Sequence, residues 1–269
     1  MRNLQNKNKF SIKEVFNMEL SKLKAIDFHS HFNNGSRLDP AETDIYKFGL
    51  DFLKNGYDAA NISTACFSTY AGVLSNEEVA IENDYLYNLA LDTPWIYQWV
   101  VIEPRHPETF EQAKKMLDSP KCIGIKIHSP CHGYPIAEYA DAIFSFAAER
   151  GAVVQMHPDD MGRMPEFANK YHDMKLVIAH LGTVDHVNAI EDAKYGNIYT
   201  DTSGVASSNN NVVEYAISRI GADRILFGTD TYAAGFQRGR IEYAPIPEEY
   251  KIKILRDNAI RICPKLKVL

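Results

Sequence analysis

Short apolar segments alternate along the chain with longer segments in which apolar residues recur at helical spacing. Residues 95–102, WIYQWVVI, are almost entirely apolar, as is typical of a strand buried on both faces of a sheet. Residues 76–92, just before them, carry apolar side chains such as Val79, Leu86 and Leu89 at positions that predict a helix. The same succession of strand and helix continues to residue 262.

Eight such units can be read along the chain. The expected strands cover residues 25–32, 58–67, 95–102, 122–128, 152–157, 175–180, 197–202 and 224–228. The expected helices cover residues 44–56, 76–92, 107–118, 136–150, 162–172, 183–194, 209–220 and 247–262. Strands that alternate with helices form a parallel sheet, and eight units in 269 residues predict an α/β fold of the (β/α)8 TIM barrel type.

A six-stranded, doubly wound sheet is the alternative fold. It would need a glycine-rich phosphate-binding turn after the first strand, where this chain has His29-Ser30-His31. No linker rich in Gly, Ser or Pro divides the chain, so we expect residues 23–269 to form a single barrel catalytic domain. Residues 1–22 form an N-terminal extension. Its residues 10–20 fit a short helix packed outside the barrel, or else the start is overlong and Met18 is the true initiator.

Composition narrows the class of protein. The net charge is −6, with acidic and basic residues interspersed, so we expect no nucleic-acid partner. No apolar run reaches the roughly 18 residues that cross a membrane, and the polar N-terminus is unlike a secretory signal. The four cysteines include no closely spaced pair, which favours a reduced, cytoplasmic protein. The expected partner is a small-molecule substrate, with a homodimer as an open alternative.

Candidate chemistry lies where the expected strands end. The first strand ends in His29 and His31, which share one face because strand side chains alternate. Later strands end in Lys126 and His128, His157, His180 and Asp230. Active sites of such barrels lie at the C-terminal ends of the strands, so these ligands and proton carriers converge on one rim.

The phrases IDFHSHF, GIKIH, VIAHLG, ILFGTD and NAIRIC resemble the amidohydrolase-2 family of the amidohydrolase superfamily. The resemblance extends from about Ala25 to Cys263. That family includes aminocarboxymuconate-semialdehyde and γ-resorcylate decarboxylases as well as lactone and amide hydrolases. The resemblance implies that one divalent metal ion, Zn²⁺ or alternatively Mn²⁺, is held by His29, His31, His157 and Asp230.

The resemblance also implies catalytic residues. His180 is expected to act as an acid or base beside the metal, and Asp230 to accept the proton of the attacking water as well as bind the ion. Lys126 and His128 are expected to contact substrate or orient the site. In binuclear members of the superfamily a lysine at this strand is carbamylated and bridges two metals, and that alternative stays open for Lys126, as does a plain ion pair between strands.

Further candidate substrate contacts lie on loops after the strands. Arg105, His132 and Tyr134 follow the third and fourth strands, and Arg238 lies in an expected long loop after Asp230. Arginine is the preferred planar partner of a carboxylate, so Arg105 and Arg238 are candidate substrate clamps.

The expected activity is hydrolysis of a C–O or C–N bond in a small lactone, ester or amide by metal-activated water. One alternative is non-oxidative decarboxylation of a small aromatic or unsaturated carboxylic acid at the same kind of site. A non-enzymatic alternative is a barrel that binds a metal or ligand without turnover.

Overall fold

Eight parallel strands form one sheet whose spatial order is the chain order, β1 to β8. The structure is a computed structural model that describes residues 20–269. The strands are β1 (Ala25–Phe32), β2 (Ile62–Thr69), β3 (Ile96–Val101), β4 (Cys122–Ile127), β5 (Val153–Met156), β6 (Lys175–Ile178), β7 (Ile198–Asp201) and β8 (Ile225–Leu226). Because each strand pairs in parallel with the next one, the (β/α)8 barrel is confirmed.

The barrel closes between its last strand and its first. The backbone N–H of Phe28 in β1 donates to the carbonyl of Phe227, at 2.9 Å, and the N–H of Asp230 donates to the carbonyl of His29, at 2.8 Å. We call this junction the β8–β1 seam. It brings residues from opposite ends of the chain side by side.

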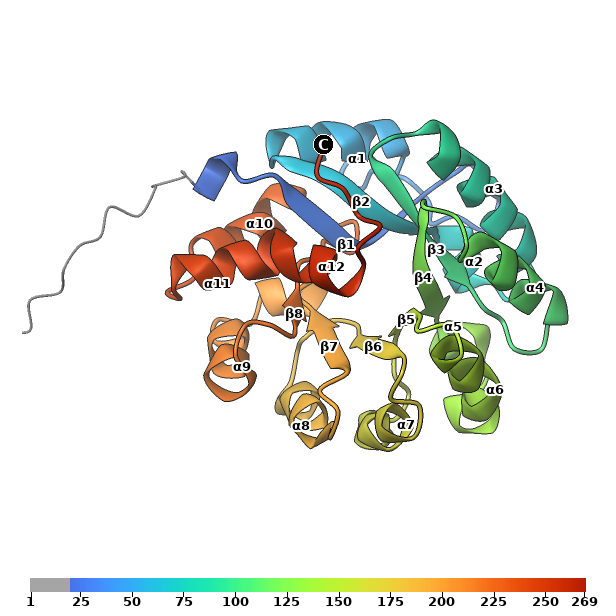
Figure 1. Ribbon diagram of the computed structural model, residues 1–269. Coiled ribbons are helices and arrows are strands. Elements are labelled where there is room, and N and C mark those ends of the chain that lie inside the picture. The colour runs from blue at the N-terminus through green and yellow to red at the C-terminus, as the bar shows by residue number, and fades with distance from the viewer. Residues whose placement is uncertain (1–19) are drawn as a thin grey trace, which may run out of the picture.

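Helices surround the strands on the outside (Figure 1). They are α1 (Leu50–Ala59), α2 (Tyr70–Leu74), α3 (Val79–Asp92), α4 (Pro107–Met116), α5 (Ser129–His132), α6 (Ile136–Ala148), α7 (Met164–Lys170), α8 (Val184–Asp192), α9 (Val212–Ile220), α10 (Ala234–Glu242), α11 (Glu248–Ile252) and α12 (Asn258–Ile262), with short 3-10 segments η1 (Leu20–Lys22), η2 (Met161–Arg163) and η3 (Gly204–Ser207) and the π-helical turn η4 (Lys253–Asp257). None of the helices within residues 20–269 is long and apolar enough to cross a membrane.

The structure corrects the first expected helix, which was placed over residues 44–56. Helix α1 begins only at Leu50, because the segment before it pairs with the end of β1. The N–H of Asn33 donates to the carbonyl of Phe48, at 2.9 Å, and Asn33 forms an isolated bridge with Gly49. Backbone groups used in that pairing are not free to form a helical turn. The expected helix over residues 10–20 lies almost entirely outside the described residues.

An apolar layer fills the interior of the barrel beneath the ends of the strands. Trp99 of β3 is buried, and its indole Nε1–H donates to the carbonyl of Phe28, at 3.0 Å. The rings of Trp99 and Phe28 meet edge to face, with centroids 5.0 Å apart. Gly124 of β4 lies against the same indole, where a Cβ would come within 2.6 Å of Trp99. This floor supports His29, the residue after Phe28.

Candidate metal centre

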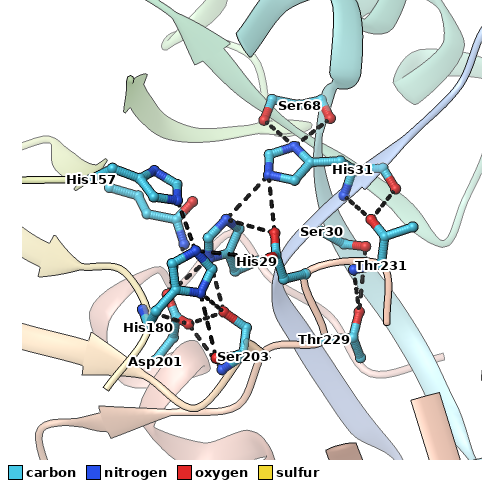
Figure 2. Close-up of polar contacts among 12 residues, drawn as sticks. His29, Ser30, His31, Ser68, His157, His180, Asp201, Ser203, Thr229 and Thr231 are labelled. Carbon is cyan, nitrogen blue, oxygen red and sulfur yellow. Dashed lines mark hydrogen bonds and ion pairs between the residues drawn. The ribbon is translucent and has the colours of Figure 1, made fainter. Parts of the chain in front are cut away.

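Five side chains that the sequence placed on the barrel rim converge in the structure, and Figure 2 shows the four imidazoles among them, those of His29, His31, His157 and His180. Nε2 of His29 lies 3.2 Å from Nε2 of His31, and Nε2 of His157 lies 2.8 Å from Nε2 of His180. Oδ1 of Asp230 lies 3.4 Å from Nε2 of His31 and 3.7 Å from Nε2 of His29, and its Oδ2 lies 3.8 Å from Nε2 of His180. One small volume is therefore bounded by four imidazoles and one carboxylate.

Irregular backbone conformations position several of these side chains in the cluster. The pairing of β1 with β2 shifts register between Asp27 and Ser30, so the strand is irregular at His29. His180 and Asp230 have positive φ angles, +61° and +52°. Non-glycine residues seldom adopt this left-handed region, and such strain is concentrated at functional sites. The turn after β6 and the turn after β8 are thus shaped to place His180 and Asp230.

Hydrogen bonds behind the rings hold three of the imidazoles. Nδ1 of His29 lies 3.0 Å from Oδ2 of Asp201, and Nδ1 of His180 lies 2.9 Å from Oγ of Ser203. Nδ1 of His31 lies 3.1 Å from the backbone carbonyl of Ser68. A histidine whose Nδ1–H is donated in this way presents Nε2 as the free ligand atom. The three Nε2 atoms therefore face the shared volume.

Burial keeps the imidazoles in the form that binds metal. It lowers the pKa of His29 below its usual value and that of His31 and His157 well below it. Burial alone would raise the pKa of Asp201, but the adjacent His29 holds it below its usual range. Neutral imidazole is the form that binds a metal, so burial of these rings favours metal binding.

Lys126 lies inside the same cluster. It is fully buried at the end of β4, and its Nζ is 2.8 Å from Nε2 of His29 and 3.0 Å from Oε1 of Gln155. Burial lowers the pKa of Lys126 to about 8, although Asp201 and Asp230 oppose this shift. The lysine therefore brings a positive charge next to the donor atoms.

The donor set fits a divalent metal ion. Ligand atoms that each lie about 2.0–2.2 Å from one ion are separated by about 3–3.5 Å, and the distances among the donor atoms above span that range. Within residues 20–269, donor atoms of His29, His157 and His180 lie within 4.8 Å of one another, as do those of His29, His31 and Asp230. The two groups share His29, so one ion can draw ligands from both. Imidazole and carboxylate ligands suit Zn²⁺ or Mn²⁺.

His128 also lies at the metal centre. Its ring stacks on that of His157 with centroids 4.0 Å apart, and its Nδ1 accepts from the N–H of Cys131, at 3.3 Å. Burial, together with the ammonium of Lys126, lowers the pKa of His128 to about 3. This neutral ring supports His157 from the side of β4.

Arg105 and His132 both lie against the buried carboxylate of Glu103, and their expected contacts with a substrate stay a prediction. Nε of Arg105 donates to Oε1 of the buried Glu103, at 2.7 Å, and its Nη2 donates to the carbonyl of His132, at 2.6 Å. Nδ1 of His132 lies 3.3 Å from Oε2 of Glu103, and its Nε2 lies 3.1 Å from the carbonyl of Gly72. Tyr134 is buried, with the Arg105 guanidinium 5.4 Å from its ring centroid. These contacts tie α5 to α2 and to the end of β3.

The expectation that Arg238 clamps a substrate is wrong. Its guanidinium donates to the carbonyls of Leu20, at 2.7 Å, and Asn61, at 3.0 Å. Both carbonyls precede strands, so Arg238 lies at the end of the barrel opposite the metal centre. The segment expected to be a loop is helix α10, in which Arg238 pairs with Glu242 four residues later, at 3.0 Å. The helical turn directs its side chain away from the rim.

A cavity of about 540 Å³ opens beside His180 and Asp230. Its walls include Val205, Tyr232 and Phe236, which are 49%, 56% and 60% exposed. None of the arginine or lysine side chains within residues 20–269 lines it. The metal centre therefore opens into a mainly apolar space that suits the body of a small organic molecule.

Some residues of the centre were missed from the sequence. Asp201 is the last residue of β7 and holds His29 by a hydrogen bond. The sequence did not predict that Asp201 belongs to the centre. Gln155 of β5 lies two residues before His157, and its side-chain Nε2–H donates to Oδ2 of Asp201, at 3.2 Å. Their position near strand ends was the available signal, but only the folded barrel shows which polar groups meet.

The amidohydrolase family model matches residues 26–264, so the chain belongs to the amidohydrolase-2 family of enzymes. None of the curated proteins compared with the sequence matches it.

Solved structures share the fold at low sequence identity. One is 2,6-dihydroxybenzoate decarboxylase from Rhizobium, with a TM-score of 0.73 and 17% identity over 89% of this chain and 98% of that one. A dihydroxybenzoic acid decarboxylase from Polaromonas, with bound manganese and 2-nitroresorcinol, has a TM-score of 0.70 and 18% identity over 89% and 96%. A probable 2-pyrone-4,6-dicarboxylic acid hydrolase from Acinetobacter baumannii has a TM-score of 0.62 and 17% identity over 89% and 99%.

Proposed function

We propose that this protein is a metal-dependent decarboxylase that releases CO₂ from a small aromatic carboxylic acid. The observation that carries the proposal is the union of a metal-binding cluster with an apolar cavity, through His180 and Asp230, which belong to both. The cavity of about 540 Å³ is within the usual range for small-molecule sites. An aromatic ring packs there against Val205, Tyr232 and Phe236.

Charge at the base of the cluster suits a carboxylate. His29, His31, His157 and Asp230 would hold a divalent ion, which would supply a positive charge able to bind and polarise an anionic oxygen. Lys126 adds a second positive charge close to the same place, since its Nζ lies only 2.8 Å from Nε2 of His29. With its carboxylate directed at the cluster, the substrate keeps its apolar ring in the cavity.

The reaction needs one positioned proton donor. In decarboxylation a proton adds to the ring carbon, the electron pair of the C–C bond stays with the ring, and CO₂ leaves. Nε2 of His180 faces the cluster, and its Nδ1 is held by Ser203, at 2.9 Å. We assign proton delivery to Nε2 of His180, which carries a proton only when both ring nitrogens are protonated, with Oδ2 of Asp230, 3.8 Å away, as a charged partner.

Hydrolysis of a small lactone is the second candidate, and it was the favoured expectation from sequence. The same imidazole and carboxylate cluster suits metal-activated water, and a structurally similar protein is described as a pyrone dicarboxylate hydrolase. Decarboxylation is favoured because several similar structures are decarboxylases. The cavity also lacks, within residues 20–269, the basic side chains that a second carboxylate would need.

A substrate panel separates the two reactions. Protein loaded with Mn²⁺ or Zn²⁺ is given 2,6-dihydroxybenzoate, 5-carboxyvanillate and small lactones, while CO₂ and proton release are measured in parallel. The proposal expects CO₂ and the matching phenol in equal amounts from an aromatic acid, and their loss in His180→Asn. His172→Asn makes the same replacement at an exposed position and keeps full activity. Proton release from a lactone without CO₂ from any acid would establish hydrolysis instead.

A further inference from the structure

Two adjacent non-glycine residues at the metal centre have left-handed backbone. Asp230 has φ +52° and Thr231 has φ +68°. For a β-branched residue such as Thr231 this conformation is a genuine outlier. Strained backbone persists only where the surrounding structure imposes it. The turn that carries Asp230 must therefore be held by its neighbours.

Asp27 holds the beginning of this turn. Its buried carboxylate accepts from both the N–H of Thr229, at 3.0 Å, and the Oγ1–H of Thr229, at 2.6 Å. It also accepts from the N–H of His29, at 3.1 Å, and from the hydroxyl of Tyr57 in α1, at 2.8 Å. One carboxylate thus fixes the residue before Asp230 to the backbone of a histidine in the cluster.

Thr231 holds the end of the turn. Its hydroxyl donates to the carbonyl of His31, at 2.7 Å, and accepts from the N–H of His31, at 3.0 Å (Figure 2). Both ends of the turn are therefore attached to β1 at the two histidines of the H-x-H motif. A side chain makes each attachment.

These attachments matter because the β8–β1 seam has little regular sheet. Strand β8 contains only Ile225 and Leu226, and the seam approaches closely at Gly228, where a Cβ would lie 3.0 Å from Cβ of His29. The backbone N–H groups of Thr229 and Asp230 both donate across the seam to the carbonyl of His29, and the hydroxyl of Thr231 adds the attachment at His31.

We propose that Asp27 and Thr231 are positioning residues that set the distance between the Asp230 carboxylate and the imidazoles of His29 and His31. Metal affinity then depends on two side chains that do not face the ion. The inference rests on the metal centre and not on the reaction assigned to it. It adds an outer layer of the site along the seam.

Metal affinity of the full-length protein tests the proposal. Apo protein is titrated with Zn²⁺ or Mn²⁺ in competition with a chromophoric chelator, and unfolding is followed separately by circular dichroism. Thr231→Val removes both hydrogen bonds to His31 but keeps the shape, and Asp27→Asn leaves donors without acceptors. We expect each to weaken metal binding about 10- to 100-fold, the range known for partners that orient metal ligands. Thr231→Ser keeps the hydroxyl and restores binding to within about 3-fold of the original protein.

Asn197→Ala is the control, because it removes buried hydrogen bonds to Ala168 and Met174, neither of which lies at the β8–β1 seam. It is expected to lower the midpoint of unfolding while metal affinity stays near its original value. Unchanged affinity in folded Thr231→Val, or equal affinity loss in Asn197→Ala, would overturn the proposal. If Asp27→Asn does not fold, the comparison of metal affinity between Thr231→Val and Thr231→Ser decides whether the proposal holds.

Discussion

Nζ of Lys126 lies 2.8 Å from Nε2 of His29, the nitrogen that faces the candidate metal site. A protonated lysine and a metal ion therefore compete for the same lone pair and repel each other. We predict that Lys126→Met tightens metal binding about 10-fold in the absence of substrate, because it removes a buried positive charge. The same variant raises the KM of a carboxylate substrate. Elemental analysis decides the alternative, since a carbamylated, bridging Lys126 would give two ions per chain before the substitution and fewer after it.

The histidines of the cluster are predicted to differ in function. His157→Ala should lose metal, because a ligand is removed. His180→Asn should keep the metal and lose about 10²- to 10⁴-fold in kcat, the usual contribution of positioned proton transfer. Metal content and kcat are measured for both variants side by side. Equal metal loss in the two variants would make His180 a ligand, as the 2.8 Å separation from His157 also permits.

Phe236 is predicted to select the substrate. It lines the cavity beside Asp230 from helix α10. Phe236→Ala should raise the KM of an aromatic acid several-fold with little change in kcat, because only packing against the ring is lost. Phe236→Arg should improve the use of a dicarboxylate relative to a monocarboxylate, since it adds the missing cation. Tyr243 lies at an exposed position of the same region and does not line the cavity. Tyr243→Ala should therefore change neither the KM of the aromatic acid nor the preference for a dicarboxylate over a monocarboxylate.

Acid should destabilise the metal-free protein partly through His186. Burial lowers the pKa of His186 below its usual value, and its Nε2–H donates to the carbonyl of Ala179, at 3.2 Å. Because the folded-state pKa is lower than the unfolded one, its contribution to stability is complete above about pH 6.5 and is lost as the pH falls below that value. His186→Gln keeps one donor and one acceptor but does not titrate. Between pH 7 and pH 5 the free energy of unfolding in urea should fall less for this variant than for the original protein. An equal fall in the two proteins would exclude a contribution from His186.

The barrel floor is predicted to be sensitive at Gly124. A Cβ there would meet the Trp99 ring at 2.6 Å and also the carbonyl of Val153, and the backbone cannot give way easily. Gly124→Ala should lower the free energy of unfolding by about 2–3 kcal/mol, as overpacking in a core does. Gly56→Ala in α1 has open space at that position and should be neutral or slightly stabilising. Urea unfolding compares the two variants.

The parts predictable from sequence are those with a repeating pattern. Continuous apolar runs with polar residues at their ends were enough to find the strands and the histidines of the rim, because each buried strand must end where the chain meets solvent. The start of α1 was wrong because a tertiary contact, Asn33 with Phe48, replaces a local helical preference. Arg238 was misplaced because its direction depends on α10 being a helix, which the polar sequence there does not reveal.

Asp201 illustrates a different limit. Its value to the centre lies in a hydrogen bond to His29, which lies in a strand far away along the chain. No local pattern distinguishes it from an aspartate that only supports the barrel. The fold was therefore readable from periodicity, whereas the hydrogen bonds behind the ligands required the tertiary structure.

The β8–β1 seam has a consequence for biosynthesis. Asp27 and Thr229 are 202 residues apart in sequence, so the H-x-H motif leaves the ribosome long before the turn that carries Asp230. A nascent chain that already exposes both early histidines still lacks the carboxylate and the bonds that orient them. Because the complete binding site arises only once the last strand docks, we expect a metal to bind tightly only after most of the polypeptide has been synthesised.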